Sequence, residues 1–234
     1  MPIAFVRQAT GVGSNATTCS VTITAPSAGN ALVVCFATNS NATPTGITGG
    51  GVTWAILREE DQASGVRNAN IWYGLNSSGA AGPVVITFAA KSHCAANVSE
   101  WSGLTATDLT AGTAGTSVTI DAGAVAATIN DSLVIASANN GTGGIAPSAG
   151  PTNSFNALTY VNGGDDNDLL CAYLITTAAG NYSTAWTVAS VAWAAVIATF
   201  KGTADIANPY VSINFKTPGR HAPFKPGVVK RLRN

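Results

Sequence analysis

One pattern of strand-like segments occurs twice in this chain, and the duplication constrains its fold more than any other feature. Five segments of the first half recur in the same order in the second half, at offsets of 97 to 101 residues. The matched ranges are 20–23 with 117–120, 32–34 with 133–135, 68–76 with 167–176, 84–89 with 184–189, and 94–103 with 193–202. Ordered matches at a nearly constant spacing predict two internal repeats, over about 17–103 and 114–202.

The repeated segments have the composition of β-strands. They are rich in Val, Ile, Thr and aromatic residues, and Gly, Asn, Ser or Pro bound them. Val84, Ile86 and Phe88 alternate with less apolar residues, so they point to one face of a strand. No stretch has an amphipathic helical period with caps. We therefore expect an all-β protein with about six strands per repeat and an opening strand at 3–8.

Two architectures fit the duplication in the body, residues 1–203. The favoured one is a single jelly-roll or concanavalin-like β-sandwich, in which each repeat supplies strands to both sheets. The segment 191–200 favours it because the segment is apolar on both faces. The alternative is a pair of tandem sandwiches of immunoglobulin size, with residues 104–117 as the linker.

Residues 204–234 differ from the body and predict an extended arm. Residues 1–202 carry five basic and ten acidic residues, a net charge of −5, whereas the remainder carries six basic residues and one acidic residue, a net charge of +5. Four prolines in the arm oppose a continuous helix. An arm with so little core to bury is expected to need a partner. The candidate contacts are Tyr210, Phe215, Lys216, Arg220, Phe224, Lys225, Lys230, Arg231 and Arg233.

The arm's partner is expected to be an acidic protein surface, because apolar anchors accompany the bases. Nucleic acid would attract the same bases electrostatically, but it would also have to tolerate the acidic body. A partner protein therefore explains more of the residues.

The residues that could perform chemistry are few. His93 and His221 are the only histidines, and neither lies in a nucleophile or metalloprotease motif. The acids Glu59, Glu60 and Asp61 are interpreted as a solvated loop at the end of a strand. Asp165, Asp166 and Asp168 could offer oxygen ligands to Ca²⁺, but they lack the twelve-residue EF-hand spacing, and an acidic turn is favoured. The sequence thus predicts no enzyme, no cofactor and no metal.

The cysteines and the hydropathy restrict the cellular setting. Cys19, Cys35, Cys94 and Cys171 form no CxxC pair, and buried free thiols are expected. No secretory signal opens the chain, and no apolar run reaches the roughly 20 residues of a membrane helix. We expect synthesis in a cytosol and no membrane contact.

The segments GNALVV (29–34), IWYGLN (71–76) and VSEWSGL (98–104) resemble, in style and strand order, β-sandwich structural proteins of tailed-bacteriophage virions. The resemblance covers about residues 20–202, and no site residue can be carried over from it. It implies a virion subunit made in the host cytoplasm, most specifically an oligomeric capsid-decorating (cement) protein that contacts other virion subunits. Another head or tail accessory protein fits the same resemblance.

Two further functions stay open. A lectin-like module that binds a host glycan would need a tryptophan or tyrosine exposed beside Asp or Asn side chains, although most of the tryptophans are expected in the core. A glycan-active enzyme is the remoter alternative, and it would need two carboxylates that face one cleft.

Overall fold

The computed structural model describes residues 1–39, 42, 44–62, 67–141, 143–164 and 167–203. Of these residues 72% are in strands and none is in a helix, so the all-β prediction is confirmed. The strands are β1 (Ala4–Ile23), β2 (Ala31–Thr38), β3 (Pro44–Thr48), β4 (Ala55–Asp61), β5 (Asn68–Gly74), β6 (Gly82–Ser102), β7 (Leu104–Ala127), β8 (Ser132–Asn140), β9 (Asn156–Ala157), β10 (Val161–Asn162), β11 (Asp168–Thr176) and β12 (Gly180–Gly202).

The strands form two six-stranded antiparallel sheets with the same strand order. The first sheet runs β1-β6-β2-β5-β4, with β3 beside β6, and the second runs β7-β12-β8-β11-β10, with β9 beside β11. Each sheet comes from one half of the chain, so the expectation that each repeat supplies both sheets is wrong. The reason is the length of β6 and β12, which have 21 and 23 residues. Strands this long pair with several segments of their own repeat, so its backbone hydrogen bonds are satisfied locally.

The predicted linker is also part of a sheet. Residues 104–117 begin β7, which pairs with β12 over most of its length. Only Gly103 separates the last strand of the first sheet from the first strand of the second. Residues 104–117 therefore belong to the second sheet and do not form a free linker.

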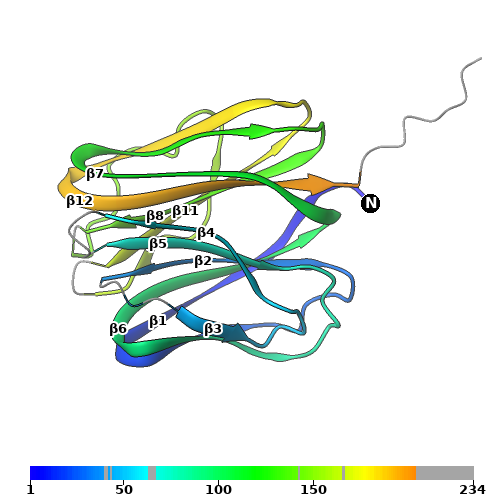
Figure 1. Ribbon diagram of the computed structural model, residues 1–234, viewed down its shortest axis with the longest axis horizontal. Coiled ribbons are helices and arrows are strands. Elements are labelled where there is room, and N and C mark those ends of the chain that lie inside the picture. The colour runs from blue at the N-terminus through cyan, green and yellow to red at the C-terminus, as the bar shows by residue number, and fades with distance from the viewer. Residues whose placement is uncertain (40–41, 43, 63–66, 142, 165–166, 204–234) are drawn as a thin grey trace, which may run out of the picture. The chain divides into compact units, whose positions relative to one another are not determined.

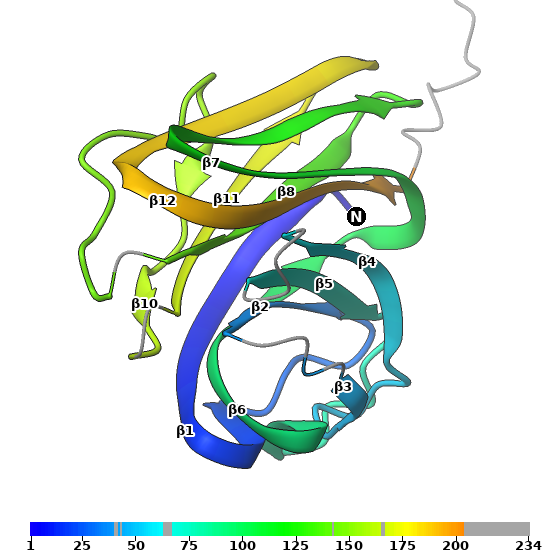
Figure 2. The ribbon, with the colours of Figure 1, turned by 60° about the vertical axis from the view of Figure 1, so that its left-hand side comes forward.

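The long antiparallel strand pairs β1–β6 and β7–β12 bend back over their own sheets. The first half of β1 pairs with the second half of β6, while Thr18–Ile23 pair with the first half of β6, and register shifts separate the two regions. Figure 2 shows β1 and β6 curling together at the lower end of the molecule. The bend encloses an outer core that contains Val21, Leu32 and Ile86. The paired strands β7 and β12 enclose a second outer core that contains Ile120, Val134 and Trp186.

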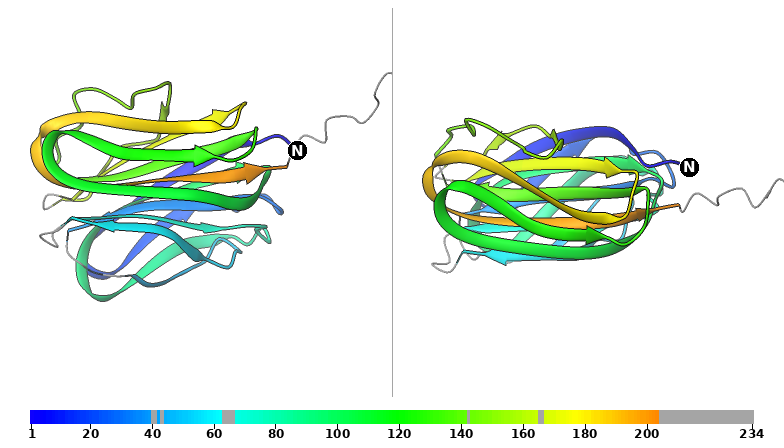
Figure 3. Two further views of the ribbon diagram at one scale, coloured as in Figure 1. Left: turned by 45° about the horizontal axis from the view of Figure 1, so that its top comes forward. Right: turned by 90° about the horizontal axis from the view of Figure 1, so that it is seen from above.

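A third core joins the two sheets. Figures 1 and 3 show the sheets as stacked layers, and β2, β5 and β6 contact β8, β11 and β12. Val33, Ile71 and Trp101 of the first sheet share this central core with Ile135 and Phe200 of the second. Every residue of β2 and β8 is buried, because successive side chains alternate between the central core and an outer core. The β-sandwich prediction is therefore confirmed.

The contacts between the sheets follow an approximate two-fold relation. β4 faces β7, β5 faces β12, β2 faces β8, β6 faces β11 and β1 faces β10. By their places in the two sheets, β1 is equivalent to β7, β2 to β8, β4 to β10, β5 to β11 and β6 to β12. Exchanging each strand for its equivalent leaves this set of contacts unchanged. The interface therefore has the form of an isologous dimer contact, with both halves on one chain.

Candidate interaction site

The predicted partner-binding residues of the arm lie outside the described residues. They are Tyr210, Phe215, Lys216, Arg220, Phe224, Lys225, Lys230, Arg231 and Arg233. Their role stays a prediction from the sequence. The structure does describe the point on the body where the arm begins.

That point is fixed by hydrogen bonds at the junction of the two sheets. The hydroxyl of Thr203 donates to the carbonyl oxygen of Met1 at 2.7 Å and accepts from the amino terminus at 3.2 Å. The Thr203 amide donates to the carbonyl of Gly103 at 3.1 Å. Thr203, the last described residue, is thus bonded both to the first residue of the chain and to the connection between the repeats.

An acidic row lies on an edge of the first sheet. Glu59, Glu60 and Asp61 belong to β4, not to the solvated loop expected from the sequence. β4 pairs with β5 from Ala55 opposite Tyr73 to Asp61 opposite Asn68, so the pairing continues through the acids. Among the described strands, β4 has no sheet neighbour on its other side. Three consecutive carboxylates therefore border an open sheet edge.

The carboxylates of this row have different partners. The amide nitrogen Nδ2 of Asn68 donates to Oε1 of Glu59 at 2.6 Å and to Oδ1 of Asp61 at 2.5 Å. Oε2 of Glu60 pairs with Arg58 at 2.5 Å on the opposite face of the strand, which faces Gly112 of β7. β4 thus carries one basic side chain, that of Arg58, and three acidic ones, which leaves the strand with a net negative charge.

Sequence reasoning did not identify the structural role of Glu100, an acid that is fully buried beside a cation. Glu100, in β6, lies 2.8 Å from Nε of Arg7, and its other oxygen accepts from the Ser27 amide at 2.8 Å and from Asn30 at 2.7 Å. The bonds tie the turn at 27–30 to β6. Glu100 therefore has a structural role, and a lone acid inside an apolar strand was the available signal.

The calcium candidates do not form a site in the described residues. Asp165 and Asp166 lie outside them. Asp168 is buried, and its Oδ2 accepts the Gly144 amide at 2.7 Å. Burial and the neighbouring Asp168 carboxylate raise the pKa of Tyr160 above its ordinary value. Nowhere in the described ranges do three His, Cys, Asp or Glu side chains gather so that they could hold a metal ion.

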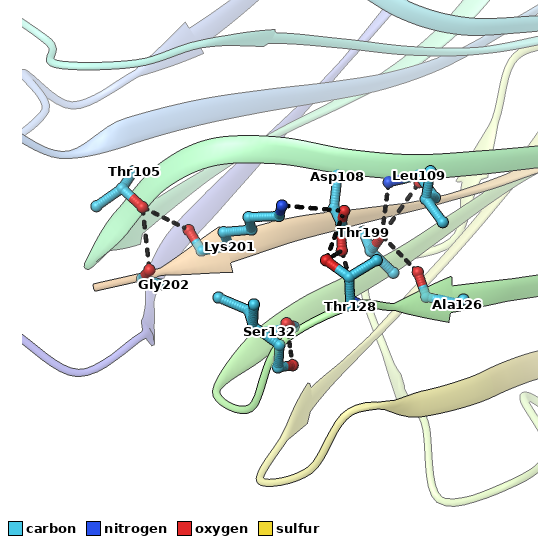
Figure 4. A network of polar contacts seen from close by, with 10 residues as sticks. Thr105, Asp108, Leu109, Ala126, Thr128, Ser132, Thr199, Lys201 and Gly202 are labelled. Atoms are coloured by element: carbon cyan, nitrogen blue, oxygen red, sulfur yellow. Dashed lines mark hydrogen bonds and ion pairs between the residues drawn. The ribbon is translucent and has the colours of Figure 1, made fainter. Parts of the chain in front are cut away.

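Asp108 links β7 to β12 near the base of the arm, as Figure 4 shows. Its carboxylate accepts the Thr128 amide at 2.7 Å and the Thr128 hydroxyl at 2.8 Å, and Nζ of Lys201 lies 3.3 Å away. Burial alone would raise the pKa of Asp108, but the Thr128 hydrogen bonds and the Lys201 charge outweigh it and lower the pKa. The network ties down the end of β12, two residues before Thr203.

The tryptophans divide into two groups. Trp101, Trp186 and Trp193 are buried in the cores, as expected. Trp54 and Trp72 are half-buried, and both pack against the outer core of the first sheet. A sugar platform could use only these two among the five tryptophans.

The chain matches no protein-family model, and neither a curated protein nor a solved structure resembles it at a significant level. Within the described part of the chain, no helix is long and apolar enough to cross a membrane.

Proposed function

We propose that this chain is a structural virion subunit, most specifically a phage capsid-decorating protein, whose arm 204–234 docks on a neighbouring subunit. The observation that carries the proposal is the separation of charge about an anchored point. The body has a net charge of −5 and the arm of +5, and the arm begins directly after Thr203. A basic arm with a fixed origin is suited to reaching an acidic surface on another subunit.

The acidic row of β4 is the receiving surface that the structure favours on a second copy. Glu59, Glu60 and Asp61 follow one another along this strand, with Glu60 on the opposite face from the other two, at a sheet edge whose backbone is unpaired in the described structure. An extended segment can add to such an edge through main-chain hydrogen bonds. Residues 210–215 of the arm read YVSINF, an alternating sequence that suits an added strand. The bases that follow, Lys216 and Arg220, would then meet the carboxylates.

Tethering gives the arm its strength. Once one contact holds the body on the particle, the arm is present at high effective concentration, and its weak contacts add to the first. The electrostatic part of the attraction is screened by salt, with a Debye length of about 8 Å at physiological ionic strength. Assembly through the arm should therefore weaken as salt rises.

The proposal is tested by binding a fluorescently labelled 204–234 peptide to the 1–203 body, measured as fluorescence anisotropy at low and high salt. Residues 1–204 form one compact unit, so the truncated body is expected to fold. Saturable, salt-sensitive binding supports docking on a second copy. Absence of binding at low salt overturns that self-docking.

Two matched variants assign the contact. Glu59→Gln/Glu60→Gln/Asp61→Asn removes the charge of the β4 row, and Asp121→Asn removes one exposed charge from the other sheet. Binding should weaken at least tenfold for the first and stay unchanged for the second. Equal binding to both bodies would move the docking surface away from β4.

Glycan binding is the second candidate function, and one observation favours it. Trp72 is half-buried, and its indole N–H makes no hydrogen bond within the described residues, whereas Asn68 and Asn70 on the same face of β5 are buried. A partly exposed indole face is one element that a sugar platform needs. A glycan-dependent change in tryptophan fluorescence that Trp72→Phe abolishes would establish it. Glycan-independent fluorescence would exclude this platform.

A further inference from the structure

The four cysteines lie in two facing pairs. All are buried and free, as predicted from the sequence. Cys19 shares the outer core of the first sheet with Cys94, while Cys35 shares the central core with Cys171. Each thiol therefore has another thiol as a neighbour in the same core.

Cys19 and Cys94 meet where the paired strands β1 and β6 bend back over the first sheet. Cys19 lies in the returning half of β1 and Cys94 in the second half of β6. The Sγ atom of Cys19 lies 4.0 Å from the carbonyl oxygen of Cys94, and burial and the nearby Cys19 thiol both raise the pKa of the Cys94 thiol. In the strand register Cys19 stands opposite Ile86 and Cys94 opposite Gly13. The contact between the two cysteines is thus tertiary and crosses the outer core.

Cys35 and Cys171 meet between the repeats. Cys35 is in β2 of the first sheet and Cys171 in β11 of the second, and these strands are in contact. Both cysteines are buried in the central core, and this burial and the nearby Cys35 thiol both raise the pKa of the Cys171 thiol. Among the described strands no backbone ladder joins the two sheets, because each strand pairs within its own sheet.

We propose that Cys19 with Cys94 and Cys35 with Cys171 are two disulfide-forming sites. The first would fix the bend of the β1–β6 strand pair, and the second would fix the contact between the two repeats. Both join places that the backbone hydrogen bonds leave unlinked. The first loop would enclose the segment from 19 to 94 and the second the segment from 35 to 171, which overlap. Closing long loops restricts the unfolded chain, so both disulfides should stabilise the fold.

The oxidant is a low-molecular-weight disulfide, such as oxidised glutathione. One cysteine thiolate attacks it, forms a mixed disulfide and releases one glutathione thiolate. The second cysteine of the pair, after losing its proton, displaces the other glutathione. Each protein disulfide thus consumes one oxidised glutathione, produces two reduced molecules and leaves the protein two hydrogen atoms lighter.

The disulfides are expected to form during folding and not in the closed native state. Burial raises the pKa of the Cys94 and Cys171 thiols well above the ordinary value, and the neighbouring thiols of Cys19 and Cys35 raise it further. Few reactive thiolates are therefore present in the folded protein. A reduced chain made in a reducing cytosol would keep its thiols until it unfolds in an oxidising medium.

The test refolds the full-length chain from denaturant in a glutathione redox buffer and, in parallel, in excess reductant. Peptide mapping without reduction should find Cys19 linked to Cys94 and Cys35 linked to Cys171. Thermal unfolding of the oxidised chain should occur roughly 5–15 °C higher than that of the reduced chain, and reductant under unfolding conditions should abolish the difference.

Single variants show whether each pair acts alone. Cys35→Ala should leave only the Cys19–Cys94 disulfide, and Cys19→Ala should leave only the Cys35–Cys171 disulfide. Other pairings, intermolecular disulfides, four free thiols in the redox buffer, or a lower unfolding temperature after oxidation would each overturn the proposal. If a variant does not fold, the wild-type peptide map still decides.

Discussion

Trp101 packs edge-to-face against Tyr173, with ring centroids 4.9 Å apart and an interplanar angle of 73°. Phe200 packs against Tyr73 in the same way, at 5.9 Å and 71°. In the strand register Tyr73 stands opposite Val33 and Tyr173 opposite Ile135, while Trp101 pairs with Ala31 and Phe200 with Leu133. The two aromatic pairs are therefore the same contact made twice, each with one ring from either repeat.

This reciprocal contact predicts a large and shared contribution to stability. Trp101→Ala and Phe200→Ala should each lower the free energy of unfolding by about 3–5 kcal/mol, because both rings are fully buried. Val118→Ala, at a side chain 54% exposed, is the control and should change it by less than about 0.5 kcal/mol. Urea unfolding followed by circular dichroism measures all three.

Double-mutant cycles separate the two pairs. Trp101 and Tyr173 should show a coupling of about 0.5–1.5 kcal/mol in the free energy of unfolding, because their rings touch. A cycle between Trp101 and Tyr73 should give a much smaller value. Equal coupling in both cycles would contradict the pairing.

Asp108 should make the stability depend on pH in the acid range. Its folded-state pKa is lowered, so its contribution is fully present above the unfolded-state pKa of about 3.9 and is lost as pH falls through the folded value. Asp108→Asn should cost about 1–2 kcal/mol near neutral pH, and the difference from wild type should shrink below about pH 4. Thermal unfolding of both proteins between pH 3 and 7 tests this. A constant difference would show that the charge is not responsible.

Arg7 should contribute to the stability of the fold because it neutralises the Glu100 carboxylate. Arg7→Met leaves the fully buried carboxylate without its cation. The expected loss is about 2–3 kcal/mol, below the range for a fully buried pair because the Arg7 side chain is 35% exposed. The double variant Arg7→Met/Glu100→Leu should recover part of the loss. Chemical denaturation of the two proteins gives the comparison, and no recovery would mean that removing the unpaired charge does not outweigh the loss of the Ser27 and Asn30 hydrogen bonds to Glu100.

Gly103 should tolerate no side chain. Its φ is +75°, and a Cβ atom there would lie 2.5 Å from the Pro2 carbonyl oxygen and 2.6 Å from that of Met1. Gly103→Ala should lower stability by about 1–3 kcal/mol and loosen the N-terminus. Amide exchange at residues 1–5 should rise in the variant. Gly164→Ala is the control, since it has positive φ but an open Cβ position.

The sequence patterns predicted the strands better than their arrangement. Composition and alternation identified the all-β class, and Val84, Ile86 and Phe88 share one core as their alternation indicated. Pairing partners depend on contacts between distant segments, which alternation does not report. That is why the sequence offers residues 104–117 as a linker in the tandem-sandwich alternative and places Glu59, Glu60 and Asp61 in a loop at the end of β4.

The repeat alignment shows the same limit at single-residue scale. Aligning Leu32 with Leu133 is one residue out of register, because Leu32 faces an outer core and Leu133 the central core. Such a slip exchanges the two faces of a strand. In the structure Cys19 pairs with Ile86, and Ile120 pairs with Trp186, the equivalent of Ile86. Ile120 is therefore equivalent to Cys19, whereas the match of 20–23 with 117–120 aligns it with a residue four positions later. The strand position of the acids Glu59 to Asp61 and the anchoring of Thr203 could not be predicted from the sequence, because they depend on strand pairing and on hydrogen bonds between distant residues.

The most direct test of assembly through the arm is the sedimentation-velocity mass of the full-length chain beside a 1–203 truncation, at low and high salt. Assembly through the arm predicts that only the full-length chain self-associates and that high salt reverses the association. Monomers of both proteins at every salt concentration, or equal association of both, would contradict it.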